Sequence, residues 1–211
     1  RLREATGREI RIANDADCFA LAEARFGAAR GWRNVFGLIL GTGVGGGICV
    51  GGRVLNGLHG IAGEWGHNPI PGEDRPCYCG RRGCIETVIA GPSLQRFYRE
   101  SGGEDLRLPE ICARAGAGED LAIRTLDRLG GKFAQAIAAA INILDPDAIV
   151  IGGGVGNIPL LYEPPVREAI LRHLFNPELK TKILRPLLGD RSEEHTSELQ
   201  SPCNLVCRLL L

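Results

Sequence analysis

Three cysteines and one histidine fall within a short glycine-rich segment. His67 is followed by Cys77, Cys79 and Cys84, with the cysteines in the run CYCGRRGC. One imidazole and three thiolates form a closed set of four ligands, the usual shell of a tetrahedral structural zinc ion. Thiolates also favour zinc over magnesium or calcium. The alternative is three free thiols beside an unrelated histidine, but ligand type and spacing together favour zinc in a structural role.

Two carboxylates flank this set of metal ligands. Glu64 lies three residues before His67, and Glu86 lies two residues after Cys84. A bound metal would therefore bring both carboxylates toward one place. Carboxylates accept hydrogen bonds from hydroxyl groups, so the pair suits a polyhydroxyl ligand such as a sugar. The alternative is that both side chains only support the loop.

The pair Asn14-Asp15 lies where a short predicted strand, residues 11–14, meets a predicted helix over residues 16–31. Asp is a common residue at the start of a helix, where its side chain accepts a backbone N–H. Local sequence alone therefore favours a helix-capping role for Asp15 over a chemical one.

Two glycine-rich turns follow apolar segments. The first, GTGVGGG at 41–47, comes after a strand predicted at 34–40 and opens a hairpin that turns at Gly51-Gly52. It lacks the GK[ST] ending of a P-loop and precedes a strand, so the dinucleotide fingerprint does not fit either. Its backbone N–H groups could approach a phosphate, with the Thr42 hydroxyl beside them. A second turn, IGGGVG at 151–156, ends another strand, and two such turns favour a nucleotide site over plain chain reversal.

The remaining elements alternate between strand and helix, which predicts an α/β layered domain. An Ala-rich helix should end at the DPD of residues 145–147. Besides the elements given above, we expect helices over 92–101, 108–117, 119–144 and 159–175 and strands over 148–152 and 181–186.

Composition narrows the class of protein. The 211 residues carry 25 basic and 25 acidic side chains, so charge gives no hint of a nucleic-acid or membrane partner. No apolar run is long enough to span a bilayer, and the first residues lack an apolar signal core. Three of the six cysteines before residue 191 crowd together and the others stand singly. This is no disulfide framework, and we expect a reducing, cytoplasmic setting.

Both ends of the sequence read unusually. The chain starts at Arg1 inside what reads as the end of a helix, so we expect upstream sequence to be missing. Residues 191–211 share no periodicity with what precedes them. Residues 191–201 resemble the conceptual translation of a common sequencing-library adapter, so we interpret 191–211 as a non-native tail.

These motifs together resemble the ROK family (repressors, open reading frames and kinases). The resemblance rests on the runs IRIANDADCFALAEA, LNGLHGIAGEWGHNPIP, CYCGRRGCIE and NILDPDAIVIGGGVGN. It implies the α/β fold of the actin/hexokinase-like ATPases (ribonuclease H-like). Residues 31–190 would form the C-terminal lobe with an inserted zinc loop, 67–84, and residues 1–30 would be a remnant of the N-terminal lobe and hinge.

The resemblance also implies an ATP-dependent hexose kinase, a homodimer that uses ATP, Mg²⁺ and a structural Zn²⁺. Asp15 matches the catalytic base. The residues matching sugar contacts are Asn14, Asp15, Glu64, His67 and Glu86, and those matching nucleotide contacts are Gly41, Thr42, Gly43, Gly152, Gly153 and Gly154. The loops look most like those of bacterial fructokinases and mannofructokinases, so fructose to fructose 6-phosphate is the expected reaction. This chain alone is expected to be inactive.

Three other readings stay open. The first is an N-acetylglucosamine kinase or glucokinase of the same family. The second is a ROK transcriptional repressor that senses a sugar and carries its helix-turn-helix upstream. The third is a zinc-stabilised sugar-binding module without chemistry. The intact run GTGVGGG argues against the repressor, because a sensor needs no phosphate turn.

Overall fold

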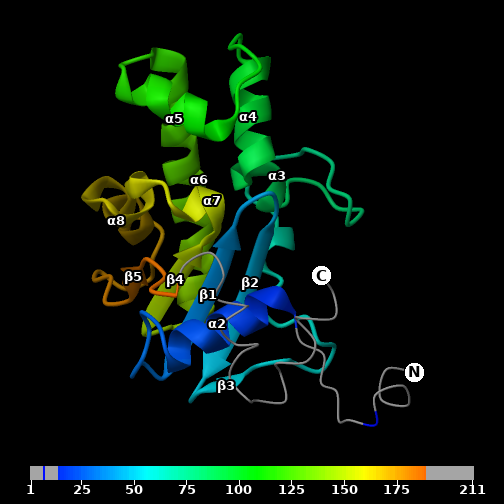
Figure 1. The fold of residues 1–211 in the computed structure, drawn as a ribbon, viewed down its shortest axis with the longest axis vertical. Helices are drawn as coiled ribbons and strands as arrows, with labels where there is room; N and C mark the ends of the chain where they lie inside the picture. Colours follow the sequence, from blue (N-terminus) through cyan, green and yellow to red (C-terminus); the bar gives the residue numbers. More distant parts are fainter. Residues whose placement is uncertain (1–6, 8–13, 189–211) are drawn as a thin grey trace.

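The computed structural model describes Gly7 and residues 14–188 (Figure 1). The strand predicted over 11–14 lies outside the described residues except for Asn14, and so does the tail predicted at 191–211. Among the described helices, none is both long and apolar enough to cross a membrane.

A five-stranded mixed sheet forms the centre of the described part, in the order β3-β2-β1-β4-β5. β1 pairs in parallel with β4, and β4 in parallel with β5, whereas β2 and β3 run antiparallel as the predicted hairpin. Gly51 and Gly52 both take positive φ at the turn of this hairpin, which confirms its position. The strands are β1 (Asn34–Leu40), β2 (Val44–Val50), β3 (Arg53–Val54), β4 (Ala148–Gly152) and β5 (Lys182–Leu184).

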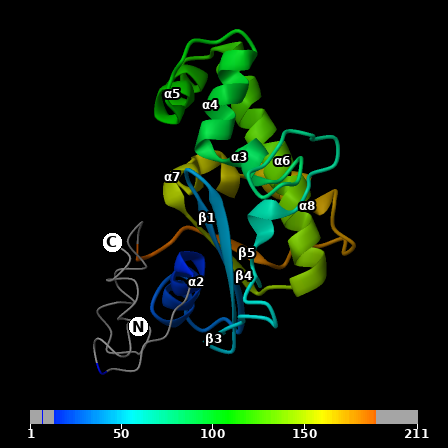
Figure 2. The same ribbon diagram turned by 90° about the vertical axis from the view of Figure 1, so that its right-hand side faces the viewer.

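Side chains of the central strands alternate between two apolar clusters, because successive residues of a strand point to opposite faces. Helix α2 (Asp15–Arg25) covers one face, where Val35 of β1 and Val150 of β4 belong to its cluster. Phe36 and Ile149 point to the larger cluster on the other face. Figure 2 shows α2 on one side of the sheet and α6 and α8 on the other.

The prediction that residues 41–47 form a loop is wrong in its second half, because Gly45, Gly46 and Gly47 lie within β2. A side chain at Gly47 would meet the carbonyl oxygen of Ala16 at 2.3 Å. Gly45 and Gly47 therefore let helix α2 lie directly on the strand, and only residues 41–43 form the turn between β1 and β2.

Helix α6 (Asp120–Leu144) crosses the other face and buries Leu129, Phe133 and Ile137 completely. It ends at Leu144 and is followed by the C-cap Asp145, which adopts φ 42°, so the predicted break at the DPD is confirmed. The left-handed conformation ends the helix because the next residue, Pro146, cannot follow a residue in helical geometry without a clash.

The upper part of Figure 1 holds the smaller helices α3 (Glu86–Ile89), α4 (Gly91–Glu100) and α5 (Leu108–Gly116). The helices predicted over 92–101 and 108–117 are thus confirmed as α4 and α5. The remaining short elements are η1 (Trp65–His67), α7 (Gly153–Gly156), η2 (Pro159–Tyr162) and α8 (Pro164–Leu171).

Two predicted helices have different bounds in the structure. The one expected over 159–175 is split into η2 and α8, because Glu163 precedes Pro164 and is held extended. The helix expected to reach Gly31 ends at Arg25. Its end is fixed by the buried Glu23, whose carboxylate accepts the N–H of Ala28 at 2.8 Å in place of a helical carbonyl.

Candidate functional site

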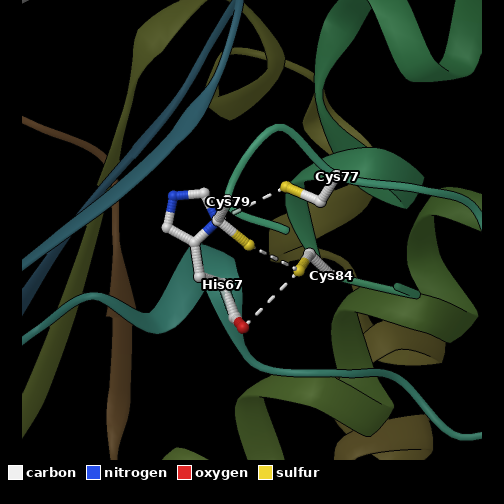
Figure 3. A group of neighbouring side chains, drawn as sticks. All are labelled: His67, Cys77, Cys79 and Cys84. Carbon is white, nitrogen blue, oxygen red and sulfur yellow. Dashed lines mark hydrogen bonds between the residues drawn. The ribbon is translucent and has the colours of Figure 1, made fainter. Parts of the chain in front are cut away.

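The structure brings the four predicted metal ligands together. One ligand atom from each of His67, Cys77, Cys79 and Cys84 lies within 4.8 Å of the others. Figure 3 shows the imidazole and the three sulfur atoms gathered around one point. Cys77 Sγ lies 3.6 Å from His67 Nδ1, and Cys79 Sγ lies 3.6 Å from Cys84 Sγ. Zinc bonds of about 2.3 Å to sulfur and about 2.0 Å to nitrogen give tetrahedral edges of about 3.6–3.8 Å, so the set fits zinc.

The thiols of this cluster have unequal acidity. Burial, and then hydrogen bonds with Cys79 and Cys77, raise the pKa of Cys84 to about 12. A hydrogen bond from the backbone of Arg81 lowers the pKa of Cys79. Since a metal binds thiolates, metal binding must displace the Cys84 proton. The affinity of the cluster for metal should therefore decrease as the pH is lowered.

An ion pair network holds the metal loop against α6. The Glu73 carboxylate accepts hydrogen bonds from Arg128 at 2.6 Å and Lys132 at 2.9 Å. Burial would raise the pKa of Glu73, but these two cations outweigh it and lower the pKa. This ion pair network was not predicted from the sequence, because Glu73 and its partners on α6 are more than fifty positions apart and share no motif.

Asn14 rather than Asp15 caps helix α2. The Asn14 Oδ1 accepts the N–H of Ala16 at 2.9 Å, and the Asp15 Oδ1 accepts the same N–H at 2.8 Å. The capping role first favoured for Asp15 is therefore corrected, since Asp15 is the first residue inside the helix and its carboxylate is exposed. Asn14 Nδ2 also donates to Glu64 Oε1 at 3.5 Å, which joins the two ends of the predicted sugar site.

Glu86 and His67 complete the predicted sugar contacts from two other elements. Glu86 begins α3, and its Oε2 accepts the backbone N–H of Val44 at 3.0 Å. His67 ends η1, and its Nε2 lies 3.0 Å from the hydroxyl of Tyr78. Val44 and Tyr78, the partners of Glu86 and His67 in these contacts, were not predicted from the sequence.

Asp17 is a further acidic group that was not predicted from the sequence. It is 9% exposed, and its Oδ1 is buried without a hydrogen-bond partner. Burial, followed by the charges of Glu64 and Asp15, raises the pKa of Asp17 to about 6. In the sequence it looks like an ordinary acidic residue in the first turn of a helix, so no signal marked it.

A cavity of about 810 Å³ opens beside the turn between β1 and β2. Gly41 and Thr42 line it from that turn, and Gly154 lines it from α7. The two predicted nucleotide turns therefore face one space. Other lining residues come from α4, α5 and α6 and include Gln95, Leu108, Cys112 and Asp127.

Three predicted nucleotide residues do not line this cavity. Gly152 ends β4, where a side chain would meet the ring of Phe19 at 2.8 Å. Gly153 takes φ 83° directly after it, and a side chain there would meet the Leu40 carbonyl oxygen at 2.4 Å. Gly43 instead adjoins Glu86, whose Oε2 would lie 2.7 Å from an added Cβ.

A second cavity of about 880 Å³ lies between the metal loop and α6. Glu64, His67 and Cys79 reach it, while Asn14, Asp15 and Glu86 do not. Its other walls are mostly apolar and include Ala139 and Ile143 of α6. This cavity therefore borders the polar site but does not contain it.

Comparison with known proteins agrees with the resemblance to the ROK family. The profile of the ROK family matches residues 1–195. The N-acetyl-D-glucosamine kinase of Photobacterium profundum is 38% identical over 194 residues, which cover 87% of this chain and 64% of that protein. The chain thus spans just under two thirds of the length of this relative.

Two solved structures share the fold. The ROK hexokinase from Thermus thermophilus matches with a TM-score of 0.85 and 33% identity, over 99% of this chain and 68% of that one. A ROK family transcriptional regulator, a homolog of the E. coli MLC protein, matches with a TM-score of 0.77 and 30% identity, over 92% and 54%. The predicted fold class, the actin/hexokinase-like α/β fold, is confirmed.

Proposed function

This chain belongs to the ROK family, and from that premise we propose that it is part of an ATP-dependent sugar kinase acting on N-acetyl-D-glucosamine. The name of the Photobacterium profundum relative supports this sugar. It does not support fructose, the sugar expected from the loop sequences, which stays the second substrate to test.

One observation carries the kinase proposal. The Glu86 carboxylate, a predicted sugar contact, holds the N–H of Val44 at 3.0 Å. Val44 directly follows the turn that lines the 810 Å³ cavity through Gly41 and Thr42. The proposed sugar site and the proposed phosphate-binding turn would therefore adjoin each other, as transfer between two bound substrates requires.

Asp15 is the proposed base. Its carboxylate is exposed at the first turn of α2, where the hydrogen bond from the Ala16 N–H fixes one oxygen. As the sugar oxygen bonds to the γ-phosphorus of ATP, its proton passes to Asp15, and the bond from phosphorus to the ADP oxygen breaks. Asn14, Glu64, His67 and Glu86 orient the sugar so that one hydroxyl faces the phosphate. Mg²⁺ bound to ATP would offset the charge of the phosphates.

Zinc has a structural role in this proposal. His67, Cys77, Cys79 and Cys84 would hold it, and four protein ligands leave no position for a substrate. When bound, the ion would fix the loop that carries His67, and with it Glu86, two residues beyond Cys84.

A phosphorylation assay tests the proposal on the native gene product, meaning the protein expressed with its native upstream sequence and its native C-terminal sequence. ADP release is measured with N-acetylglucosamine, fructose, mannose and glucose. The proposal expects the highest kcat/KM with N-acetylglucosamine. A preference for fructose would restore the first expectation, and no turnover with any sugar in a folded, zinc-loaded protein would refute the kinase.

The likeness to the transcriptional regulator supports a second candidate, a sugar-sensing repressor. That regulator is 30% identical to this chain, close to the 33% of the hexokinase. Both candidates bind sugar, but only the kinase needs Asp15 and the turn at residues 41–43. Sugar-dependent DNA binding without phosphorylation would decide for the repressor.

We also propose a domain organisation and an oligomeric state from the membership of the ROK family. Residues 31–190 act as one lobe with the zinc loop at 67–84, and the active protein is a homodimer. Light scattering of the native gene product tests the dimer, and a monomer at working concentrations would refute it.

A further inference from the structure

Tyr78 stands out on the metal loop, between the ligands Cys77 and Cys79. It is 83% exposed, so its ring is not held by packing in a core. It nevertheless makes two specific contacts with His67. Its hydroxyl lies 3.0 Å from Nε2, and the two rings meet edge to face at 88° with centroids 5.1 Å apart.

The other nitrogen of His67 faces the metal site. Nδ1 lies 3.6 Å from Cys77 Sγ, so a metal in the cluster would bind Nδ1. The neutral ring then carries its proton on Nε2, which becomes a donor. Within the described part of the chain, the Tyr78 oxygen is the acceptor recorded for that donor.

The Tyr78 hydroxyl occupies the nitrogen of His67 that faces away from the metal ligands. His67 is itself one of the residues proposed to contact the sugar. A sugar bound at its Nε2 would therefore bring a hydroxyl to the place that the phenol occupies. An imidazole N–H offers a single hydrogen bond, so the phenol and a sugar hydroxyl compete for it.

We propose that Tyr78 is a substrate-displaced residue of the sugar site, whose hydroxyl holds the Nε2–H of His67 until a sugar hydroxyl takes its place. This inference rests on the proposed function, because it needs a sugar at His67. Gly80, two residues later in the loop, has φ 85°, a backbone conformation that residues with side chains rarely adopt. In the free protein the Tyr78 contact keeps the imidazole aimed at the site.

A purely structural role for Tyr78 makes a different prediction. Histidines that bind a metal usually donate their second N–H to a fixed partner, and loss of that partner lowers metal affinity about 10–100-fold. Tyr78 is 83% exposed, so water can accept the Nε2–H of His67 when the phenol is removed, and the metal ligand keeps a partner. Zinc affinity and sugar affinity therefore separate the two roles.

The test compares the zinc-loaded native gene product with its Tyr78→Phe variant. This change keeps the ring and removes only the competing oxygen. The sugar Kd, measured by calorimetry with N-acetylglucosamine, should fall about 2–10-fold, the equivalent of one net hydrogen bond. Zinc affinity, measured by competition with a chelator, should stay within about twofold of wild type.

Two results overturn the proposal while leaving the kinase intact. One is a sugar Kd that is unchanged or higher in Tyr78→Phe. The other is a loss of zinc affinity of about tenfold or more, which would make Tyr78 a support of the metal site. If neither protein binds any sugar while holding zinc, the proposed function and this inference fail together.

Discussion

The Glu86 carboxylate accepts the backbone N–H of Val44 at 3.0 Å, and so joins the zinc loop to the turn between β1 and β2. Glu86 lies two residues after the ligand Cys84, and Val44 directly follows residues 41–43. One side chain therefore contacts the turn proposed to bind phosphate and adjoins the residues proposed to bind sugar. A substitution in the turn should therefore affect sugar binding, and a substitution of Glu86 should affect the turn.

Gly43→Ala tests this link. The added Cβ would lie 2.7 Å from Glu86 Oε2, so the carboxylate must move away from the Val44 N–H. Loss of a hydrogen bond to a charged group should lower kcat/KM for the sugar about tenfold, although Gly43 is not a sugar contact.

A double-mutant cycle provides the control for Gly43→Ala. If that change acts by displacing Glu86, then adding Glu86→Gln should cost far less in the Gly43→Ala background than in wild type. Additive losses in kcat/KM would show that the two residues act separately.

Glu73→Gln should destabilise the protein at neutral pH. Because Arg128 and Lys132 keep the pKa of Glu73 below its usual 4.5, the stability from this ion pair is present above that pH and is lost as pH falls through the folded pKa. The expected cost is about 1–3 kcal/mol at pH 7, shrinking toward pH 3, in urea melts.

The exposed pair of Arg99 and Asp105 is the matched comparison for Glu73. Asp105→Asn should change the unfolding free energy by less than about 0.5 kcal/mol, because water screens an exposed pair. Equal losses in the two variants would contradict the special role of Glu73.

In contrast to Glu73→Gln, the substitution Asp17→Asn should stabilise the protein at neutral pH. The folded pKa of Asp17, about 6, exceeds its ordinary 3.8, so the folded state holds the proton longer and the unfolding free energy falls as pH rises between these values. Removing the charge should stabilise the protein by about 1–3 kcal/mol above pH 7 and by little at pH 4. Melts of both proteins at each pH measure the difference, and no gain at neutral pH would refute the burial of this charge.

The metal site can be tested by composition. Elemental analysis should find about one zinc per chain, and Cys84→Ser should lose it on dialysis. Cys112→Ser is the control, because Cys112 lines the 810 Å³ cavity away from the cluster and should leave zinc content unchanged. A chelator should lower the melting temperature of wild type but not of Cys84→Ser.

Features that depend on local chemistry could be predicted from the sequence. The ligands His67, Cys77, Cys79 and Cys84 were identified by type and spacing, and the structure gathers them at one point. The break after α6 was predicted from the DPD, since proline excludes helical geometry in the residue before it.

Features that depend on distant contacts could not be predicted. Nothing near Glu73 indicates Arg128, and nothing near Gly47 shows that α2 will lie on it. The early end of α2 depends on the buried Glu23, which looks like an ordinary helical residue in an Ala-rich run. Tyr78 offered one unused signal, an aromatic ring between two metal ligands.

The central claim is that Asp15 removes the proton from the sugar hydroxyl, and Asp15→Asn in the native gene product tests it most directly. Sugar Kd and kcat are measured on the same zinc-loaded protein. We expect a sugar Kd within about threefold of wild type and a kcat lowered at least about 100-fold, the usual contribution of a general base. Turnover near that of wild type, with sugar still bound, would contradict the account.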